Sequence, residues 1–272
     1  MRELVLALVK RDLKARYRRS LLGFAWSLLR PAFLTLVLWG VFSGLLRADM
    51  AAPGAPYWLH LLVSVLTWNY LLGAVTEATH SVVANGNLLK KTPLDAAVFP
   101  AAAVAGQTIH YGLAMAVAVP VALLAGARPG FGALLALPAV VAVAASLAMA
   151  VGMLLAAAQV RFRDTGSALE LAGMAWFYAT PVLYGIDKAR ATLSARPASG
   201  AGDGGAWLTE LYLANPAAPI MAGVRRATLG TAEMPDSELA LRLGAVAAFS
   251  MVALAAARAL YARVAPDFAD QL

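Results

Sequence analysis

The fold is decided by two neighbouring stretches, the basic MRELVLALVKRDLKARYRRS of residues 1–20 and the apolar LLRPAFLTLVLWGVFSGLL of residues 28–46. Seven lysines and arginines crowd the first stretch, and long Ala, Leu and Val runs with short polar gaps dominate the chain beyond the second. A bilayer accepts helices of about 20 apolar residues, and basic residues are retained on its cytoplasmic side. The pattern therefore predicts a multi-pass membrane protein with a cytoplasmic N-terminus.

Composition excludes an ordinary soluble domain. The 272 residues are 61% hydrophobic and 14% charged, whereas about 25% of residues are charged in typical soluble domains. The apolar runs are continuous rather than alternating, which favours helices over a barrel. At about 20 residues per span, the length allows roughly six spans. We therefore expect an all-α membrane protein with six transmembrane helices.

The residue types that carry most enzyme chemistry are absent or isolated. There are no cysteines, and none of the five lysines follows a glycine as a P-loop requires. His60, His80 and His110 show no paired metal spacing, and Glu77 and Glu170 fall near helix ends where water is close. The net charge of +7 fits anionic headgroups rather than nucleic acid. We expect no catalytic, metal-binding or cofactor-binding residue on this chain.

The N-terminal segment of residues 1–27 is predicted to be an amphipathic interfacial helix. Its apolar residues recur at helical spacing: Leu6, Val9, Leu13, Tyr17 and Leu21. A plain positive topology anchor is the alternative. Since proline breaks a helix interior, Arg30-Pro31 is predicted to mark the turn into the bilayer.

Five spans are predicted within residues 28–186, at 28–46, 57–78, 98–125, 131–159 and 168–186, and the last at 239–262. Residues 187–238 form an outer loop with two short re-entrant helices, at 206–214 and 217–229. Residues 263–272 form a cytoplasmic tail. In this arrangement 14 of the 22 lysines and arginines lie inside, which places both termini in the cytoplasm.

Six aromatic residues within the predicted spans are candidates for lining a passage. They are Trp39, Phe42, Trp176, Phe177, Tyr178 and Tyr184. Aromatic faces stack on the C–H surfaces of sugar rings, so such a passage would suit a carbohydrate chain. Ordinary packing and headgroup contact remain the alternatives.

Residues 11–31, RDLKARYRRSLLGFAWSLLRP, resemble the opening of permease subunits of type-2 ABC transporters that export bacterial surface polysaccharides, the O-antigen and teichoic-acid exporters. Weaker matches follow at Lys90-Lys91 with Pro93, at RFRD 161–164, at Asn215-Pro216 and at FADQL 268–272. The chain departs from the family at Arg30, where Asn is usual, and in a Gly-rich insertion at 199–205.

The resemblance implies a homodimer in the bacterial cytoplasmic (inner) membrane, paired with two copies of a separate nucleotide-binding ATPase. ATP and Mg²⁺ would bind to that partner and not to this chain. The substrate would be a lipid-linked polysaccharide, conducted between the two permeases along a path lined partly by the first and fifth spans. The two outer helices would form a gate.

The resemblance also implies roles for polar residues on the cytoplasmic side. Segment 84–96 would be a coupling helix and segment 161–168 a second ATPase contact, with these contact residues: Asn87, Leu88, Lys90, Lys91, Pro93, Arg161, Arg163 and Asp164. Arg16, Arg18 and Arg19 would either attract the pyrophosphate of the lipid carrier or bind only headgroups.

Three other function classes compete with this interpretation. A type-2 exporter of capsule, drug, haem or lipid has the same architecture but not the N-terminal motif. A membrane-embedded glycan-assembly enzyme would need ordered acids or bases in the outer loop, and residues 187–238 show no recognisable arrangement. A proton-coupled transporter would need acids at mid-membrane depth, which are missing.

Overall fold

The computed structural model describes residues 2–17, 25–46, 54–92, 94–195, 204–265 and 268. Within these ranges every regular element is a helix, as predicted. In chain order they are α1 (Arg2–Tyr17), α2 (Ala25–Trp39), the π-helical turn η1 (Gly40–Leu45), α3 (Tyr57–Ala84), α4 (Gly86–Lys91), α5 (Val98–Leu124), α6 (Phe131–Arg161), α7 (Thr165–Ala179), α8 (Ile186–Ser194), α9 (Gly204–Leu213), α10 (Ala217–Leu229) and α11 (Asp236–Val264).

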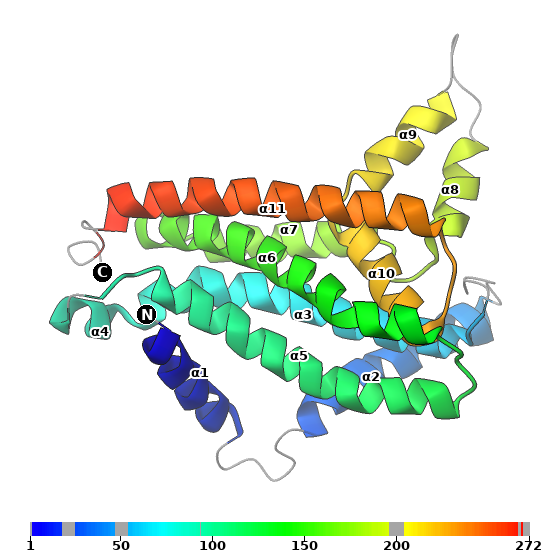
Figure 1. Ribbon diagram of the computed structural model, residues 1–272, viewed down its shortest axis with the longest axis horizontal. Coiled ribbons are helices and arrows are strands. Elements are labelled where there is room, and N and C mark those ends of the chain that lie inside the picture. Colours follow the sequence, from blue (N-terminus) through cyan, green and yellow to red (C-terminus); the bar gives the residue numbers. More distant parts are fainter. Residues whose placement is uncertain are drawn as a thin grey trace.

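The long helices form a bundle with two distinct ends (Figure 1). One end carries α4, the start of α1 and the end of α11, and is called the α4 end below. The other carries α8, α9 and α10, and is called the α10 end. Within the described ranges, five helices are long and apolar enough to span a membrane: α2 continued by η1, α3, α5, α6 and α11. The all-α membrane fold is therefore confirmed.

Helix α7 occupies the predicted fifth span, at 168–186, but is shorter than predicted. Its 15 residues give a length of about 22 Å, less than the roughly 30 Å of a hydrocarbon core. The helix stops because Pro181 forces the residue before it, Thr180, out of helical geometry (φ −108°, ψ 144°). The count of six spans therefore stays a prediction.

The predicted break at Arg30-Pro31 is wrong. Helix α2 begins at Ala25 and continues through the buried Pro31 to Trp39. The missing N–H of Pro31 would have bonded to the carbonyl of Ser27, only two residues into the helix. The loss is confined to the first turns, so the helix tolerates it.

Helix α1 packs on the bundle along one side. Leu8 and Val9 are buried in a hydrophobic cluster that includes Phe99 of α5, and Leu13 packs against this cluster, whereas Leu6 is 47% exposed. Two residues of the predicted apolar stripe, Val9 and Leu13, therefore pack inside the protein, and the contact of Leu6 with the membrane surface stays a prediction. The side chain of Tyr17, and Leu21, lie outside the described residues.

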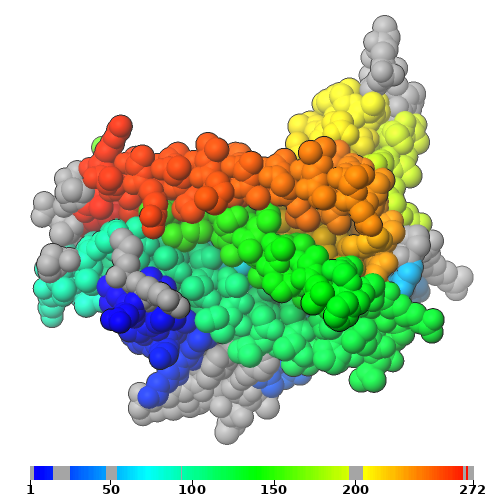
Figure 2. Space-filling view, in the orientation of Figure 1, coloured from blue at the N-terminus to red at the C-terminus, as the bar shows by residue number. Residues whose placement is uncertain are grey.

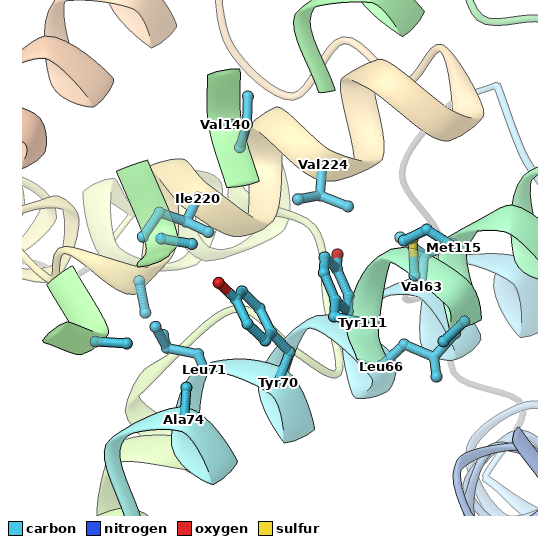
Figure 3. Close-up of a cluster of buried hydrophobic side chains, with 14 of the residues drawn as sticks. Val63, Leu66, Tyr70, Leu71, Ala74, Tyr111, Met115, Val140, Ile220 and Val224 are labelled. Atoms are coloured by element: carbon cyan, nitrogen blue, oxygen red, sulfur yellow. The ribbon is translucent and has the colours of Figure 1, made fainter. Parts of the chain in front are cut away.

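Helix α3 is the centre of the bundle. Of its most apolar window, 72% is buried, against 11% for α2 and for α11. Tyr70 of α3 stacks on Tyr111 of α5 with ring centroids 4.4 Å apart (Figure 3). Two turns farther along α3, α6 approaches so closely that a Cβ on Gly152 would lie 2.5 Å from the Cβ of Ala78. Small residues thus allow tight helix packing here.

The two predicted outer helices have nearly the predicted bounds but different surroundings. Every residue of α10 except Arg226 is buried, as expected for a short helix held inside a membrane protein. Gly230 ends α10 with a left-handed backbone (φ 76°), which glycine adopts without strain. By contrast, α9 projects from the bundle beside α8, a helix that the sequence did not predict (Figure 1).

Candidate functional site

At the α4 end, the short basic helix α4 is held to its neighbours by hydrogen bonds and apolar packing. Asn85, just before α4, accepts a hydrogen bond from Nη2 of Arg11 at 2.9 Å and donates one to the carbonyl of Ser81 at 2.8 Å. Leu88 and Leu89 pack onto the hydrophobic cluster between α1, α5 and α6. Asn87, Lys90 and Lys91 are exposed. A protein that contacts these side chains would therefore press on α1 and α3 through Asn85.

The turn between α6 and α7 lies at the same end and is also exposed. Arg161, Phe162, Arg163 and Asp164 all face solvent, and Phe162 is 62% exposed. Nε2 of Gln159 donates to the carbonyl of Arg163 at 3.1 Å. Just beyond the turn, a Cβ on Gly166 would lie 2.5 Å from Cε1 of His80. The turn is thus tied to the same end of α3 that supports α4.

Part of the predicted site falls outside the described residues. This applies to Arg18, Arg19 and Pro93, and to the side chain of Arg16. Their predicted contacts with the ATPase, pyrophosphate or headgroups stay predictions. The predicted coupling residues that are described all lie at the α4 end: Asn87, Leu88, Lys90, Lys91, Arg161, Arg163 and Asp164.

The predicted aromatic passage divides into packed and exposed rings. The rings of Trp176 and Phe177 meet Trp68 edge to face, with centroids 5.4 and 5.6 Å away. Nε1 of Trp176 donates to Oδ1 of Asn215 at 2.9 Å, just before α10. These two rings therefore join α7 to α3 and α10. Tyr178, in contrast, is 70% exposed.

Tyr184 lies beyond α7 and joins a second aromatic group. Its hydroxyl donates to the carbonyl of Tyr178 at 3.3 Å, and it accepts a hydrogen bond from the hydroxyl of Tyr212 at 3.4 Å. Trp39 is 42% exposed and Phe42 partly buried. Among the described residues, neither of these two makes a ring contact with the α7 aromatics. The structure thus brings four of the six predicted rings together and leaves the two from α2 and η1 apart.

Sequence reasoning missed a buried ion pair at the α10 end. The side chains of Arg225 and Glu233 are each 1% exposed. Nε of Arg225 donates to Oε1 of Glu233, and Nη2 donates to Oε2 at 2.6 Å. Nη1 donates to Oγ of Ser64 at 3.0 Å and to the carbonyl of Pro181 at 2.7 Å. Oε2 of Glu233 also accepts the N–H of Ile186 at 2.8 Å.

This pair connects segments that are far apart in sequence. Arg225 belongs to α10, Glu233 to the link before α11, and Ser64 to α3. Pro181 lies in the link between α7 and α8, and Ile186 is the first residue of α8. Burial alone would raise the pKa of Glu233, but the charge and hydrogen bonds of Arg225 outweigh burial and lower that pKa overall. The carboxylate therefore stays ionised and holds the guanidinium in place.

The sequence carried only a weak signal for this pair. Arg225 and Arg226 are adjacent in an apolar 13-residue helix, where two charges are unusual. Only Arg225 points inward, whereas Arg226 pairs with the exposed Asp236 at 2.7 Å. Nothing in the helix pattern distinguishes the two arginines, and Glu233 lies outside the helix.

Comparison with known proteins identifies the family. The family model described as "ABC-2 type transporter" matches residues 3–193. The chain belongs to this family. A protein named "O-antigen export system permease protein RfbA" from Myxococcus xanthus is 30% identical over 271 residues, which cover 100% of this chain and 96% of that protein. Two proteins of the same name from Klebsiella pneumoniae are each 25% identical over 185 residues, covering 68% of this chain and 70% of theirs.

The ABC-2 family match covers α1 to α8. It therefore includes α4, the α6–α7 turn and the α7 aromatics, and it ends before α9 and the buried ion pair. The Myxococcus xanthus protein aligns with the whole chain. This chain is accordingly a membrane subunit of an ABC transporter.

Proposed function

We propose that this chain is the permease of an ATP-driven exporter that moves a lipid-linked O-antigen polysaccharide across the bacterial cytoplasmic membrane. The observation that carries the proposal is the full-length similarity to the O-antigen export permease of Myxococcus xanthus. The N-terminal motif and the aromatic residues of α7 support a polysaccharide cargo. Two copies of the chain would form the passage, and two copies of an ATPase would bind ATP and Mg²⁺.

The α4 end is proposed to face the cytoplasm and to receive the ATPase. Its basic helix α4 and the exposed α6–α7 turn are the two contact points, and both are attached to α3 through Asn85 and His80. Closure of the ATPase pair on ATP would therefore move α3 and its neighbours as a rigid body. Packed interfaces switch between discrete arrangements in this way rather than deforming continuously.

The passage is proposed to run between the two permeases along α2 and α7. Tyr178 and Trp39 present exposed rings on which sugar rings can stack. Trp176 and Phe177 hold α7 against Trp68, so they support the passage wall from behind. Arg16, Arg18 and Arg19 would meet the pyrophosphate of the lipid carrier at the cytoplasmic face.

A charge reversal tests the docking proposal. Lys90→Glu places a negative charge on the exposed face of α4, and Arg128→Glu makes the same reversal at an exposed residue of the α10 end. We expect Lys90→Glu to reduce both copurification of the ATPase and surface O-antigen in a deletion strain, and Arg128→Glu to preserve ATPase copurification. Equal ATPase binding by both variants would contradict the docking proposal. Full ATPase binding without any polysaccharide export by the unmodified chain would contradict the proposed cargo.

A further inference from the structure

Helix α9 has one packed face and one free face. Gly205, Thr209 and Leu213 recur every four residues and are buried. Trp207 and Leu211, also four residues apart, are 59% and 62% exposed. At 3.6 residues per turn, these two sets lie on opposite sides of the helix. A tryptophan and a leucine thus share a surface that no described part of the chain covers.

Ion pairs hold the α8–α9 arm (Ile186–Ser194 and Gly204–Leu213) against the first turns of α11. Nη2 of Arg242 lies 3.0 Å from Oε2 of Glu210 in α9, and Nη2 of Arg190 in α8 lies 2.7 Å from Oε1 of Glu238. Nε of Arg242 also pairs with Glu238 at 2.8 Å. The arm is therefore attached at a defined level along α11, and Figure 2 shows α9 (yellow) projecting from the bundle beyond α11 (orange).

The sequence of α11 indicates the depth in the membrane at which the arm is attached. Its charged residues at the α10 end stop at Arg242, and none follows until Arg258. Charges are expensive inside the hydrocarbon core, and long basic side chains near helix ends reach to the interface. The headgroup region therefore lies at about Arg242, beside Glu210 of α9. Leu241, next to Arg242, is 75% exposed and belongs to the lipid-facing surface of α11.

We propose that α9 lies on the outer leaflet of the membrane, with Trp207 and Leu211 inserted between headgroups and acyl chains. Tryptophan is enriched at this depth, and a short helix with one apolar face binds in the plane of the interface. The apolar surface of α9 then continues the lipid-facing surface of α11. The inference rests on the span of α11 and its proposed orientation, and holds whichever polymer is exported.

The absence of cysteine from the chain gives a direct test. Leu211→Cys places a single fluorescent label on the free face of α9. Thr192→Cys, an exposed position on α8 of the same arm, is the matched control. Both positions are exposed, so neither variant disturbs a packed site. The full chain is labelled and reconstituted into vesicles of phosphatidylethanolamine and phosphatidylglycerol, with and without lipids that carry a nitroxide quencher near the headgroup.

We expect the nitroxide lipids to quench the label at position 211, and aqueous iodide to lose its quenching effect there. The label at position 192 should show the reverse behaviour. Equal iodide quenching at both positions would overturn the proposal, because α9 would then lie in water. Protection from both quenchers at position 211 would also overturn it, because protein, such as a second copy, would then cover the face. Failure of the proposed polysaccharide export would leave these quenching results unchanged.

Discussion

Replacing Glu233 by Gln should destabilise the protein strongly, although the two side chains have nearly the same shape. The carboxylate accepts two hydrogen bonds from Arg225 and one from the N–H of Ile186. Glutamine keeps one acceptor oxygen and turns an NH₂ group toward a guanidinium that can only donate. The variant therefore leaves the buried charge of Arg225 without its counter-charge.

The expected magnitude follows from the burial of both partners. A hydrogen bond to a charged group contributes about 1.5–3 kcal/mol, and at least one of the two from Arg225 is lost. Removing one partner of a buried pair costs about 3–5 kcal/mol, because the other charge stays buried and unpaired. We expect the free energy of unfolding to fall by an amount in that range, since both side chains are 1% exposed.

The neighbouring ion pair provides a matched control. Arg226 pairs with Asp236 at 2.7 Å, but the Asp236 side chain is 72% exposed, and exposed pairs contribute only about 0–1 kcal/mol. Thermal unfolding of Glu233→Gln and Asp236→Asn in the same detergent compares the loss of a buried pair with the loss of an exposed pair. The arginines of the two pairs, Arg225 and Arg226, are adjacent on α10. If the two variants unfold at the same temperature, the buried pair does not stabilise the α10 end and the reasoning is refuted.

Three further predictions concern packing, pH and the aromatic wall. Gly152→Ala should lower the free energy of unfolding by about 1–3 kcal/mol, because the new methyl group overpacks against Ala78. Gly112→Ala is the control and should leave the free energy of unfolding unchanged, because no atom lies within 4 Å of the added Cβ. Thermal unfolding of the two variants tests this difference. Because the pKa of Glu233 is lowered in the folded protein, its carboxylate should stabilise the fold at a pH above its ordinary pKa of 4.5. This stabilisation should be lost as the pH falls through the folded-state pKa. Glu233→Gln should remove this part of the pH dependence of unfolding. Tyr178→Ala should reduce export without lowering the unfolding temperature. Trp176→Ala should lower the unfolding temperature, because this variant loses the contacts with Trp68 and Asn215. A lower unfolding temperature for Tyr178→Ala but not for Trp176→Ala would contradict the roles proposed for the two rings.

The membrane-spanning helices were the most predictable part of the fold. Spans α5, α6 and α11 were predicted with ends within about three residues of the observed ones, whereas α3 begins where predicted but continues beyond the predicted end at 78 to Ala84. These spans are predictable because an apolar run of about 20 residues has few other stable structures. The end of α7 was less predictable. The sequence continues apolar past Pro181 to Tyr184, and the hydropathy of the run does not show that the proline stops the helix.

The error at Arg30-Pro31 has a related cause. Pro31 was expected to interrupt the helix, but α2 starts six residues earlier and continues through Pro31. Which apolar residues of α1 pack inside the protein depends on where α5 contacts the helix. Periodicity alone does not select the packed face, because Leu4, Val5, Leu6, Leu8 and Val9 are spread over more than half of the circumference of α1. Tertiary contact decides among them.

The sequence predicted the exposed basic residues of the site, but not the contacts between residues that are distant in sequence. Basic residues in short loops between spans are exposed at one end, so Lys90 and Arg161 could be placed from the sequence alone. The partner of Arg225 could not, because Glu233 and Ser64 reach it from different segments. Likewise, the exposure of Tyr178 and the burial of Trp176 follow from the position of Trp68 on α3, which the sequence of α7 does not contain.

The position of α3 relates the two ends of the molecule. Near one end, Ser64 accepts a hydrogen bond from Arg225. Near the other, the carbonyl of Ser81 accepts one from Asn85 at the start of α4. The two serines are 17 positions apart, which corresponds to about 26 Å of continuous helix, without an internal proline. We therefore expect a displacement of α4 to be transmitted along α3 to Arg225, and through Arg225 to α10 and to the α7–α8 and α10–α11 links. For this reason the loss of Glu233 should disturb transport even though the residue lies at the end of the bundle opposite α4.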